Sequence, residues 1–149
     1  MVNGVVYASS GDGNVYALDA TTGTLVWRYA TGNVAQHTLY SSPAVANGVV
    51  YIGSYDNNVY ALNATTGSLL WKHATNYHVQ SSPAVAHGVV YVGSDDHHVY
   101  ALNAKTGAVL WKYATNDQVW SSPTVANGTV YVGSVDAHLY AFGLAGAAE

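Results

Sequence analysis

The chain repeats one sequence unit with a period close to 40 residues, and this repeat constrains the fold more than any other feature. A short apolar segment that ends in tyrosine recurs four times, with the tyrosines 44, 40 and 40 residues apart. These tyrosines are Tyr7, Tyr51, Tyr91 and Tyr131. Residues 41–80 and 81–120 are identical at 28 of 40 aligned positions. A period of this length indicates that one supersecondary unit recurs along the chain.

The repeat is most complete in residues 81–115, which predict four short β-strands. The strands are expected at residues 81–86, 88–94, 99–104 and 108–115. The first turn, His87-Gly88, is Asn-Gly in the other three copies, and this pair is favoured by type I′ hairpin turns. Because only a few residues separate one strand from the next, neighbouring strands must run antiparallel. The unit is therefore a four-stranded meander.

The expected strands are apolar on both faces. In the second strand, Val89 and Tyr91 point to one face, and Val90 and Val92 point to the other. An antiparallel sheet with one solvated face would alternate apolar and polar residues. Each sheet should therefore be covered on both sides, and further copies of itself are the obvious cover. Four-stranded sheets stacked around an axis form a β-propeller. We predict an all-β propeller built from four-stranded antiparallel meander blades, with about four repeats per chain.

The repeat divides the chain into four blades within one expected domain, residues 1–149, which is either a propeller or half of one. The blades fall approximately at residues 1–40, 41–80, 81–120 and 121–149. Only Met1 and Val2 precede the first Asn-Gly turn, so the first blade lacks its inner strand. The last blade breaks the pattern after Tyr140, and lacks the outer strand and its tryptophan. Both end blades are expected to have three strands.

Composition excludes several classes of function. The net charge is −4, and the four basic residues do not cluster, so no surface for nucleic acid or anionic membrane is expected. The chain contains no cysteine, which rules out disulfides and thiolate metal sites. Apolar runs are only a few residues long, so we expect no transmembrane helix and no membrane insertion. No signal peptide is expected either, because Met1 leads directly into a strand.

A longer motif identifies a family resemblance. The run Val-Tyr-Ala-Leu-Asn/Asp-Ala-x-Thr-Gly-x-x-x-Trp occurs at residues 15–27, 59–71 and 99–111, and Ser-Ser-Pro-x-Val precedes the later copies. This pattern resembles the pyrroloquinoline-quinone-type, or quinoprotein dehydrogenase-like, propeller repeat, and that of the BamB-like proteins. The resemblance covers essentially the whole chain. It implies a periplasmic, secreted or cell-surface location for the parent protein, although the residues themselves indicate no compartment.

The same resemblance implies a structural role for one glycine and one tryptophan in each repeat. In that family the two residues form a docking motif that holds neighbouring blades together. The corresponding residues here are Gly23, Trp27, Gly67, Trp71, Gly107 and Trp111. The fourth blade has no such residues.

Quinone catalysis is not expected. Family members that are enzymes bind the quinone in the central channel with calcium or a lanthanide, and commonly stack an adjacent-cysteine disulfide on it. This chain has no cysteine, and its only glutamate is Glu149. We therefore predict no enzymatic activity, no catalytic residues and no cofactor. The alternative hypothesis is a fragment or relic of a quinone-dependent dehydrogenase.

Histidine and aspartate side chains are the remaining candidates for chemistry. Asp12, Asp56, Asp96 and Asp136 occupy one repeat position, which favours turn geometry over catalysis. His98 and His138 occupy equivalent positions on successive blades, and such positions should be too far apart to share an ion. No metal site is expected.

Sequence variation between the copies selects one face of the fold. The blade-to-blade linkers and the second-to-third-strand turns lie on the same side of a meander and differ between copies, whereas the other turns are nearly uniform. Function usually resides on loops that a rigid scaffold holds in place. The candidate binding residues on this face are His78, Asp95, Asp96, His97, His98, Trp120 and His138.

These observations favour a non-enzymatic scaffold or binding module whose varied loop face or channel contacts a protein, peptide or glycan. A further hypothesis is a designed or recently amplified repeat protein without an evolved ligand, which the 28 of 40 identities suggest. Incomplete end blades leave unpaired strand edges, which invite pairing. We predict a homodimer in which two chains complete a ring of about eight blades. A closed four-bladed monomer is the second hypothesis.

Overall fold

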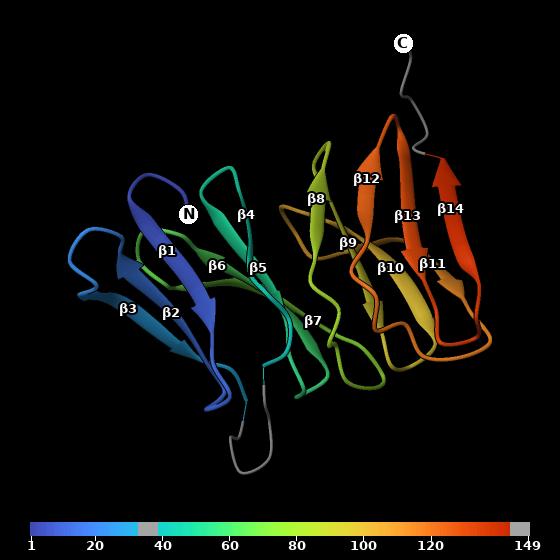
Figure 1. Cartoon of the computed structure of the whole chain (residues 1–149), viewed down its shortest axis with the longest axis horizontal. Coiled ribbons are helices and arrows are strands. Elements are labelled where there is room, and N and C mark those ends of the chain that lie inside the picture. Colours follow the sequence, from blue (N-terminus) through green and yellow to red (C-terminus); the bar gives the residue numbers. More distant parts are fainter. Residues whose placement is uncertain (33–38, 144–149) are drawn as a thin grey trace.

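A computed structural model describes residues 1–32 and 39–143 of the chain, and these residues form fourteen β-strands (Figure 1). The strands are β1 (Val5–Ser9), β2 (Asn14–Asp19), β3 (Leu25–Ala30), β4 (Ala44–Ala46), β5 (Val49–Gly53), β6 (Asn58–Asn63), β7 (Leu69–Ala74), β8 (Ala84–Ala86), β9 (Val89–Ser94), β10 (His98–Asn103), β11 (Val109–Ala114), β12 (Thr124–Ala126), β13 (Thr129–Gly133) and β14 (Leu139–Gly143).

The strands form four antiparallel sheets, and each sheet follows the order of the chain. The sheets are β1-β2-β3, β4-β5-β6-β7, β8-β9-β10-β11 and β12-β13-β14. The predicted fold class is confirmed: two complete four-stranded meanders lie between two end sheets of three strands. The inner strands β4, β8 and β12 have only three residues each, so they are shorter than the sequence pattern predicts.

The turns explain why each repeat forms a tight meander. In the turns between the first two strands, Asn47 and Gly48 have φ values of 50° and 74°, and His87 and Gly88 have nearly the same values. A type I′ turn requires positive φ at both central residues, which suits Asn and Gly. The turn between the second and third strands places a different residue in the left-handed region, Asn57 in the second blade and His97 in the third.

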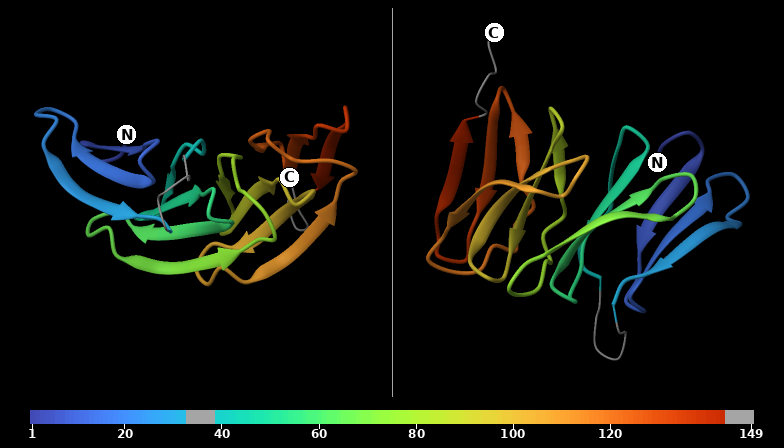
Figure 2. Two further views of the ribbon diagram at one scale, coloured as in Figure 1. Left: turned by 90° about the horizontal axis from the view of Figure 1, so that it is seen from below. Right: turned by 180° about the vertical axis from the view of Figure 1, so that it is seen from behind.

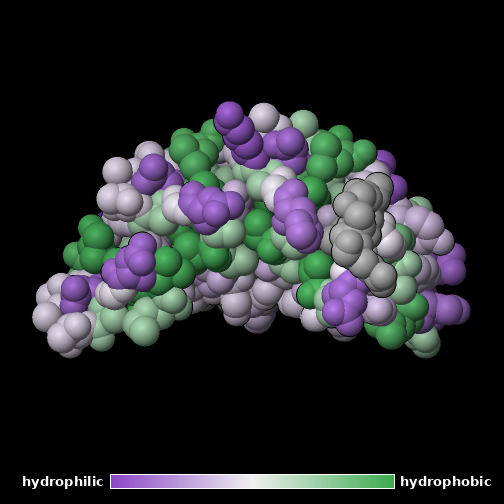
Figure 3. All heavy atoms as spheres, turned by 90° about the horizontal axis from the view of Figure 1, so that it is seen from above, coloured by the Kyte–Doolittle hydropathy of each residue, from purple (hydrophilic) through white to green (hydrophobic). Residues whose placement is uncertain are grey.

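The four blades are arranged along an open arc. Figure 1 shows the first blade at one end of the molecule and the last blade at the other, and the left view of Figure 2 shows the curvature. The space-filling view of Figure 3 has the same arched outline, with hydrophilic residues spaced along the arch between hydrophobic ones. The described blades therefore do not close into a four-bladed ring, and the closed monomer is not the form that this structure has.

The core lies between the blades. Between the second and third blades, Tyr51, Val59 and Trp71 on one sheet meet Val90 and Leu102 on the next. Equivalent residues form the cluster between the first and second blades. Because both faces of an interior blade are covered in this way, its strands are apolar on both faces, as the sequence pattern predicts.

The Ser-Ser-Pro segments join the inner strands to one another. The Oγ of Ser81 accepts a hydrogen bond from the amide of Gly93 within its own blade, at 3.1 Å. Both serines link neighbouring blades: the Oγ of Ser81 donates to the carbonyl oxygen of Ser121 at 2.9 Å, and the amide of Ser42 donates to the Oγ of Ser82 at 2.8 Å. The amide of Ser82 then donates to the Oγ of Ser122 at 3.0 Å. This repeated contact sets the spacing of the inner wall of the arc.

Candidate functional site

One contact between neighbouring blades is made by the outer-strand tryptophan. Trp71 on β7 lies over the third blade, where its Nε1–H donates to the carbonyl oxygen of Ala104 at 3.0 Å. The hydroxyl of Tyr51 donates to the same carbonyl at 3.0 Å. A Cβ added to Gly107 would lie 2.6 Å from the indole ring, so only glycine allows this approach. The tryptophan of one blade therefore contacts the glycine of the following blade.

The first blade repeats this arrangement toward the second. Trp27 Nε1 donates to the carbonyl oxygen of Ala64 at 2.9 Å, and its ring covers Gly67. Trp111 lies against Phe142, with ring centroids 5.1 Å apart, and the residues that correspond to Ala104 and Gly107 in the fourth blade lie outside the described residues. Gly23 has open space where Gly67 has a tryptophan ring. These contacts are those that a docking role requires, while the energetic contribution of each tryptophan stays a prediction.

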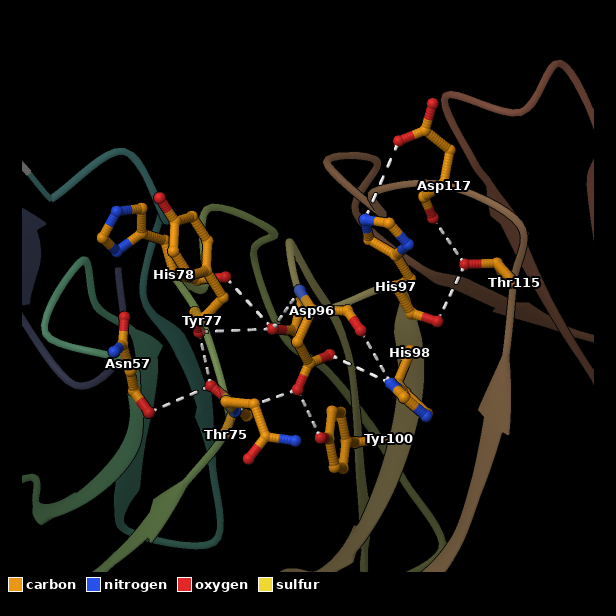
Figure 4. Close-up of polar contacts among 12 residues, drawn as sticks. Asn57, Thr75, Tyr77, His78, Asp96, His97, His98, Tyr100, Thr115 and Asp117 are labelled. Carbon is orange, nitrogen blue, oxygen red and sulfur yellow. Dashed lines mark hydrogen bonds and ion pairs between the residues drawn. The ribbon is translucent and has the colours of Figure 1, made fainter.

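The aspartates that occupy the same position in each repeat form a second type of contact between blades (Figure 4). Asp96 Oδ2 accepts hydrogen bonds from the hydroxyl of Tyr100 at 2.6 Å and from the amide of Asn76 at 3.0 Å. Asn76 belongs to the linker that leaves the preceding blade. The carboxylate therefore joins a turn of the third blade to the end of the second, and we call this arrangement the turn clamp.

The same clamp holds the fourth blade. Asp136 Oδ2 accepts from the hydroxyl of Tyr140 at 2.7 Å and from the amide of Asn116 at 3.0 Å. Partial burial alone would raise the pKa of Asp136, but the hydrogen bonds from Tyr140, Asn116 and His138 outweigh it and hold the pKa well below the usual range. The hydrogen bond to Asp136 also raises the pKa of Tyr140 to about 12.

The turn clamp predicts a loss of stability in acid. A carboxylate whose pKa is lower in the folded protein stabilises the fold above the unfolded-state pKa, here 3.8, and this contribution disappears as the pH falls through the folded-state pKa. We expect the urea midpoint to fall steadily below about pH 4. Asp136→Asn should lower the midpoint at neutral pH and flatten its acid dependence.

Asp117→Asn is the control for this measurement, because it removes a half-exposed carboxylate of the same surface that does not belong to the clamp. Urea unfolding followed by near-ultraviolet circular dichroism between neutral pH and about pH 2 measures the effect. An Asp136→Asn variant with the acid dependence of the parent chain would contradict the role assigned to this carboxylate.

The histidines of the predicted binding face do not converge. His78 and His97 come from different loops, and Figure 4 shows Asp96 between them. His98 Nδ1 donates to the carbonyl oxygen of Asp96 within its own turn, and His138 makes the same contact with Asp136. Within residues 1–32 and 39–143, no group of three or more His, Asp or Glu side chains is placed to hold a metal ion.

The predicted binding residues therefore separate into two sets. Asp96, His97, His98 and His138 belong to the turns that carry the clamp. His78 and Trp120 lie in blade-to-blade linkers, and Asp95 precedes Asp96 in the same turn but is hydrogen-bonded to the linker residue Gln80. Sequence comparison of the copies missed three neighbours of this second set, Tyr40, Tyr55 and Gln80. Their signal is variation at a repeat position, because residues 40, 80 and 120 differ from one another, as do residues 55, 95 and 135.

Contacts join most of this second set into a row. Tyr40 and Tyr55 meet edge to face at 5.4 Å, and Tyr55 stacks on His78 with ring centroids 4.1 Å apart. In the next blade, Gln80 Nε2 donates to Asp95 Oδ2 at 2.6 Å. Trp120 occupies the corresponding position in the fourth blade and is 53% exposed. We call Tyr40, Tyr55, His78, Gln80, Asp95 and Trp120 the linker rim.

Asp95 is the unusual member of the linker rim. It is buried, and its Oδ1 has no hydrogen-bond partner among the described residues. Burial raises the pKa of Asp95 from its ordinary value, and the hydrogen bond from Gln80 and the nearby His78 oppose this shift only in part. A buried carboxylate with an unpartnered oxygen destabilises a fold, and such groups concentrate at functional sites.

The donor set does not fit a quinone held by a metal ion. The described part of the chain offers neither a metal-binding cluster nor the paired thiols that would stack on a quinone. The linker rim instead presents aromatic rings, one amide and one carboxylate. These groups are suited to stacking and hydrogen bonding.

Radial stacking of four-stranded meanders, joined by the tryptophan contact and the turn clamp, defines part of a β-propeller. The chain belongs to the family described as outer membrane protein assembly factor BamB, whose model matches residues 1–80 and 56–147. The predicted family is thereby confirmed. No curated protein matches the chain.

Solved structures support the same fold. BamB from Moraxella catarrhalis superposes with a TM-score of 0.81 at 22% identity, covering 94% of this chain and 46% of that one. The computationally designed Ika4 protein has a TM-score of 0.82 at 18% identity, covering 97% of this chain and 88% of that one. Quinohemoprotein alcohol dehydrogenase from Comamonas testosteroni has a TM-score of 0.78 at 22% identity, covering 90% of this chain and 28% of that one.

These comparisons establish the fold and show its extent. The chain spans 46% of the length of the BamB structure and about a quarter of the dehydrogenase, so it matches a part of each of these propellers. In the described residues, no helix is long and apolar enough to span a bilayer.

Proposed function

We propose that this chain is a non-enzymatic binding module of the propeller family, and that the linker rim contacts its ligand. One observation carries the proposal: the rim combines the exposed aromatic side chains of Tyr40 and Trp120 with a hydrogen-bonded pair, the buried carboxylate of Asp95 and the amide of Gln80. Exposed tyrosine and tryptophan are enriched where proteins bind partners.

The ligand classes that suit this chemistry are proteins, peptides and glycans. Tyrosine and tryptophan rings provide large contact areas with few rotatable bonds. Gln80 and Asp95 provide hydrogen-bonding groups of fixed orientation, since each holds the other. The few basic residues of the chain lie outside the rim, so charge does not direct the choice of ligand.

Binding to peptide and glycan arrays, followed by titration calorimetry with the best ligand, tests the proposal. We expect the double variant Tyr40→Ala/Trp120→Ala to weaken binding by at least about tenfold, as for the central residues of other interfaces. Leu110→Ala is the matched control, because Leu110 is half-exposed and apolar but lies on the outer strand β11. Equal affinity of the double variant and the parent chain would contradict the proposal.

A relic of a quinoprotein dehydrogenase is the second candidate, and the resemblance to the quinohemoprotein alcohol dehydrogenase fold supports it. Adding the quinone, calcium and an alcohol should then reduce an artificial electron acceptor. A third candidate, a designed or recently amplified repeat protein, draws support from the likeness to the designed Ika4 and Ika8 proteins. It predicts that no ligand binds above background.

We also propose that the partner of this chain is a second copy, and that two chains complete a ring of about eight blades. The open arc supports this proposal, as does the length of the BamB and Ika8 chains, of which this chain covers 46% and 44%. We also propose a periplasmic, cell-surface or secreted location for the parent protein, and the match to the BamB family supports this proposal.

A further inference from the structure

Every interior interface of the arc uses the same two faces of a blade. The face that looks toward the following blade carries Tyr51, Val59 and Ala61 in the second blade. The face that looks toward the preceding blade carries Val90 and Leu102 in the third. We call these the leading face and the trailing face, and each is buried wherever a neighbouring blade is present.

Within residues 1–32 and 39–143, no blade covers the leading face of the fourth blade. Tyr131 corresponds to Tyr51 and Tyr91, which are 3% and 2% exposed, but Tyr131 is 38% exposed. Leu139 corresponds to Val59 and Val99, which are fully buried, but it is 73% exposed. Ala141, which corresponds to Ala61 and Ala101, is also exposed. Tyr131, Leu139 and Ala141 are thus solvent-accessible on this blade, although their equivalents form the centre of the interior interfaces.

The first blade presents the complementary trailing face. Val6 is 37% exposed, whereas Val50, Val90 and Val130 at the same repeat position are fully buried. The acceptor for the tyrosine hydroxyl is also present, since the amide of Ala20 donates to Gly4 as that of Ala64 does to Gly48. Ala20 therefore makes the same backbone hydrogen bond as Ala64, whose carbonyl accepts from Tyr7 in the first interior interface.

We infer that the leading face of the fourth blade binds the trailing face of the first blade in a second copy of this chain. This inference rests on the proposed two-chain ring and specifies its contacts. Leu139 lies against Ala8 of the other copy, as Val99 packs with Val132 in the interior. Val6 lies against Tyr131 and Ala141, as Val130 packs with Tyr91 and Ala101. The hydroxyl of Tyr131 donates to the carbonyl of Ala20, as that of Tyr51 does to Ala104. The association is head-to-tail, so two such contacts close a ring of two arcs.

The head-to-tail contact differs from the interior interfaces in one respect. The leading face of the fourth blade carries no tryptophan within the described residues, and Gly23 on the trailing face has open space above it. The contact therefore lacks the indole that covers Gly67 and Gly107 in the interior. We expect it to be weaker than an interior interface and to depend on protein concentration.

Light scattering on a sizing column tests the inference with two single variants. Val6→Asp places a charge on the trailing face, and Leu139→Asp places one on the leading face. Both side chains are exposed in the isolated chain, so neither change disturbs the interior core. We expect the parent chain to have about twice the monomer mass of 15.6 kDa, and each variant to be a monomer.

Mixing the two variants supplies the decisive result. In a head-to-tail ring, one of the two contacts in the mixed dimer carries both aspartates and the other carries none. The mixture should therefore recover dimer that neither variant forms alone. Leu70→Asp, which charges a half-exposed leucine on the outer strand β7 of an interior blade, is the control and should leave the dimer intact.

Two other outcomes overturn the inference in different ways. A dimer that only one of the variants disrupts, or that mixing does not restore, would mean that like faces pair, so the two-chain proposal would survive without the head-to-tail contact. A parent chain that is monomeric at every concentration would remove both proposals.

Discussion

Trp71→Ala is expected to lower the free energy of unfolding by about 3–5 kcal/mol, because the change removes a large, mostly buried ring from the interface between the second and third blades. A tryptophan buries about 150–250 Å² of surface. At roughly 25 cal/mol per Å², this area corresponds to about 4–6 kcal/mol before losses are counted. The neighbouring blade cannot move in to fill the cavity that the substitution leaves, because the serine links and the turn clamp hold it at a fixed spacing.

Urea unfolding measures this effect, and two variants resolve its origin. Trp71→Phe keeps most of the packing and removes the hydrogen bond to Ala104, whose carbonyl still accepts from Tyr51. We expect it to cost only about 1 kcal/mol for the hydrogen bond, plus a smaller packing loss. Trp120→Ala should change little, because Trp120 is largely exposed. An unchanged midpoint for Trp71→Ala would exclude a docking role for the tryptophan.

Gly107→Ala is expected to be nearly as damaging, for two separate reasons. Gly107 has a φ of 74°, and a residue with a Cβ in this left-handed conformation costs roughly 1–2 kcal/mol. The new methyl group would also lie 2.6 Å from the ring of Trp71. Forcing extra volume into a close-packed contact typically costs about 1–3 kcal/mol. The total is about 2–5 kcal/mol, measured by urea or thermal unfolding.

Gly23→Ala is the matched control, because it sits in the same turn of the first blade with a φ of 71° and has open space around the added Cβ. It should show the conformational cost alone, about 1–2 kcal/mol. The difference between the two variants isolates the contact between the indole and the glycine. Equal losses of unfolding free energy in the two variants would mean that the ring of Trp71 moves aside at no cost. The glycine would then serve the turn alone and would have no role in docking.

Much of the fold could be predicted because each local signal agrees with the others. The Asn-Gly pairs, the short spacing of the strands and the apolar residues on both strand faces all favour stacked meanders, and the structure has them. The inner strands are shorter than predicted, because the serines that precede them make hydrogen bonds to side chains and neighbouring blades instead of extending the ladder.

The candidate site was harder to predict. The predicted set mixed clamp residues such as Asp96 with rim residues such as Trp120, because both types lie in variable loops of one face. Tyr40, Tyr55 and Gln80 became candidates only through their contacts. The different roles of Asp95 and Asp96 were also invisible in the sequence, since they are adjacent residues whose partners, Gln80 and Asn76, come from the linker of the preceding blade.

By itself the sequence determined the repeat, the meander and the family, because turn geometry and strand periodicity depend on residues that are close together in the chain. Only the tertiary structure decided which residues meet across the blades, since each of these contacts joins residues about 20 to 57 positions apart. It showed that Trp71 covers Gly107 of the next repeat rather than the glycine of its own, and that the turn aspartates hold the linkers. The open arc and its two uncovered faces follow from the angle between packed blades, which no local pattern of residues encodes.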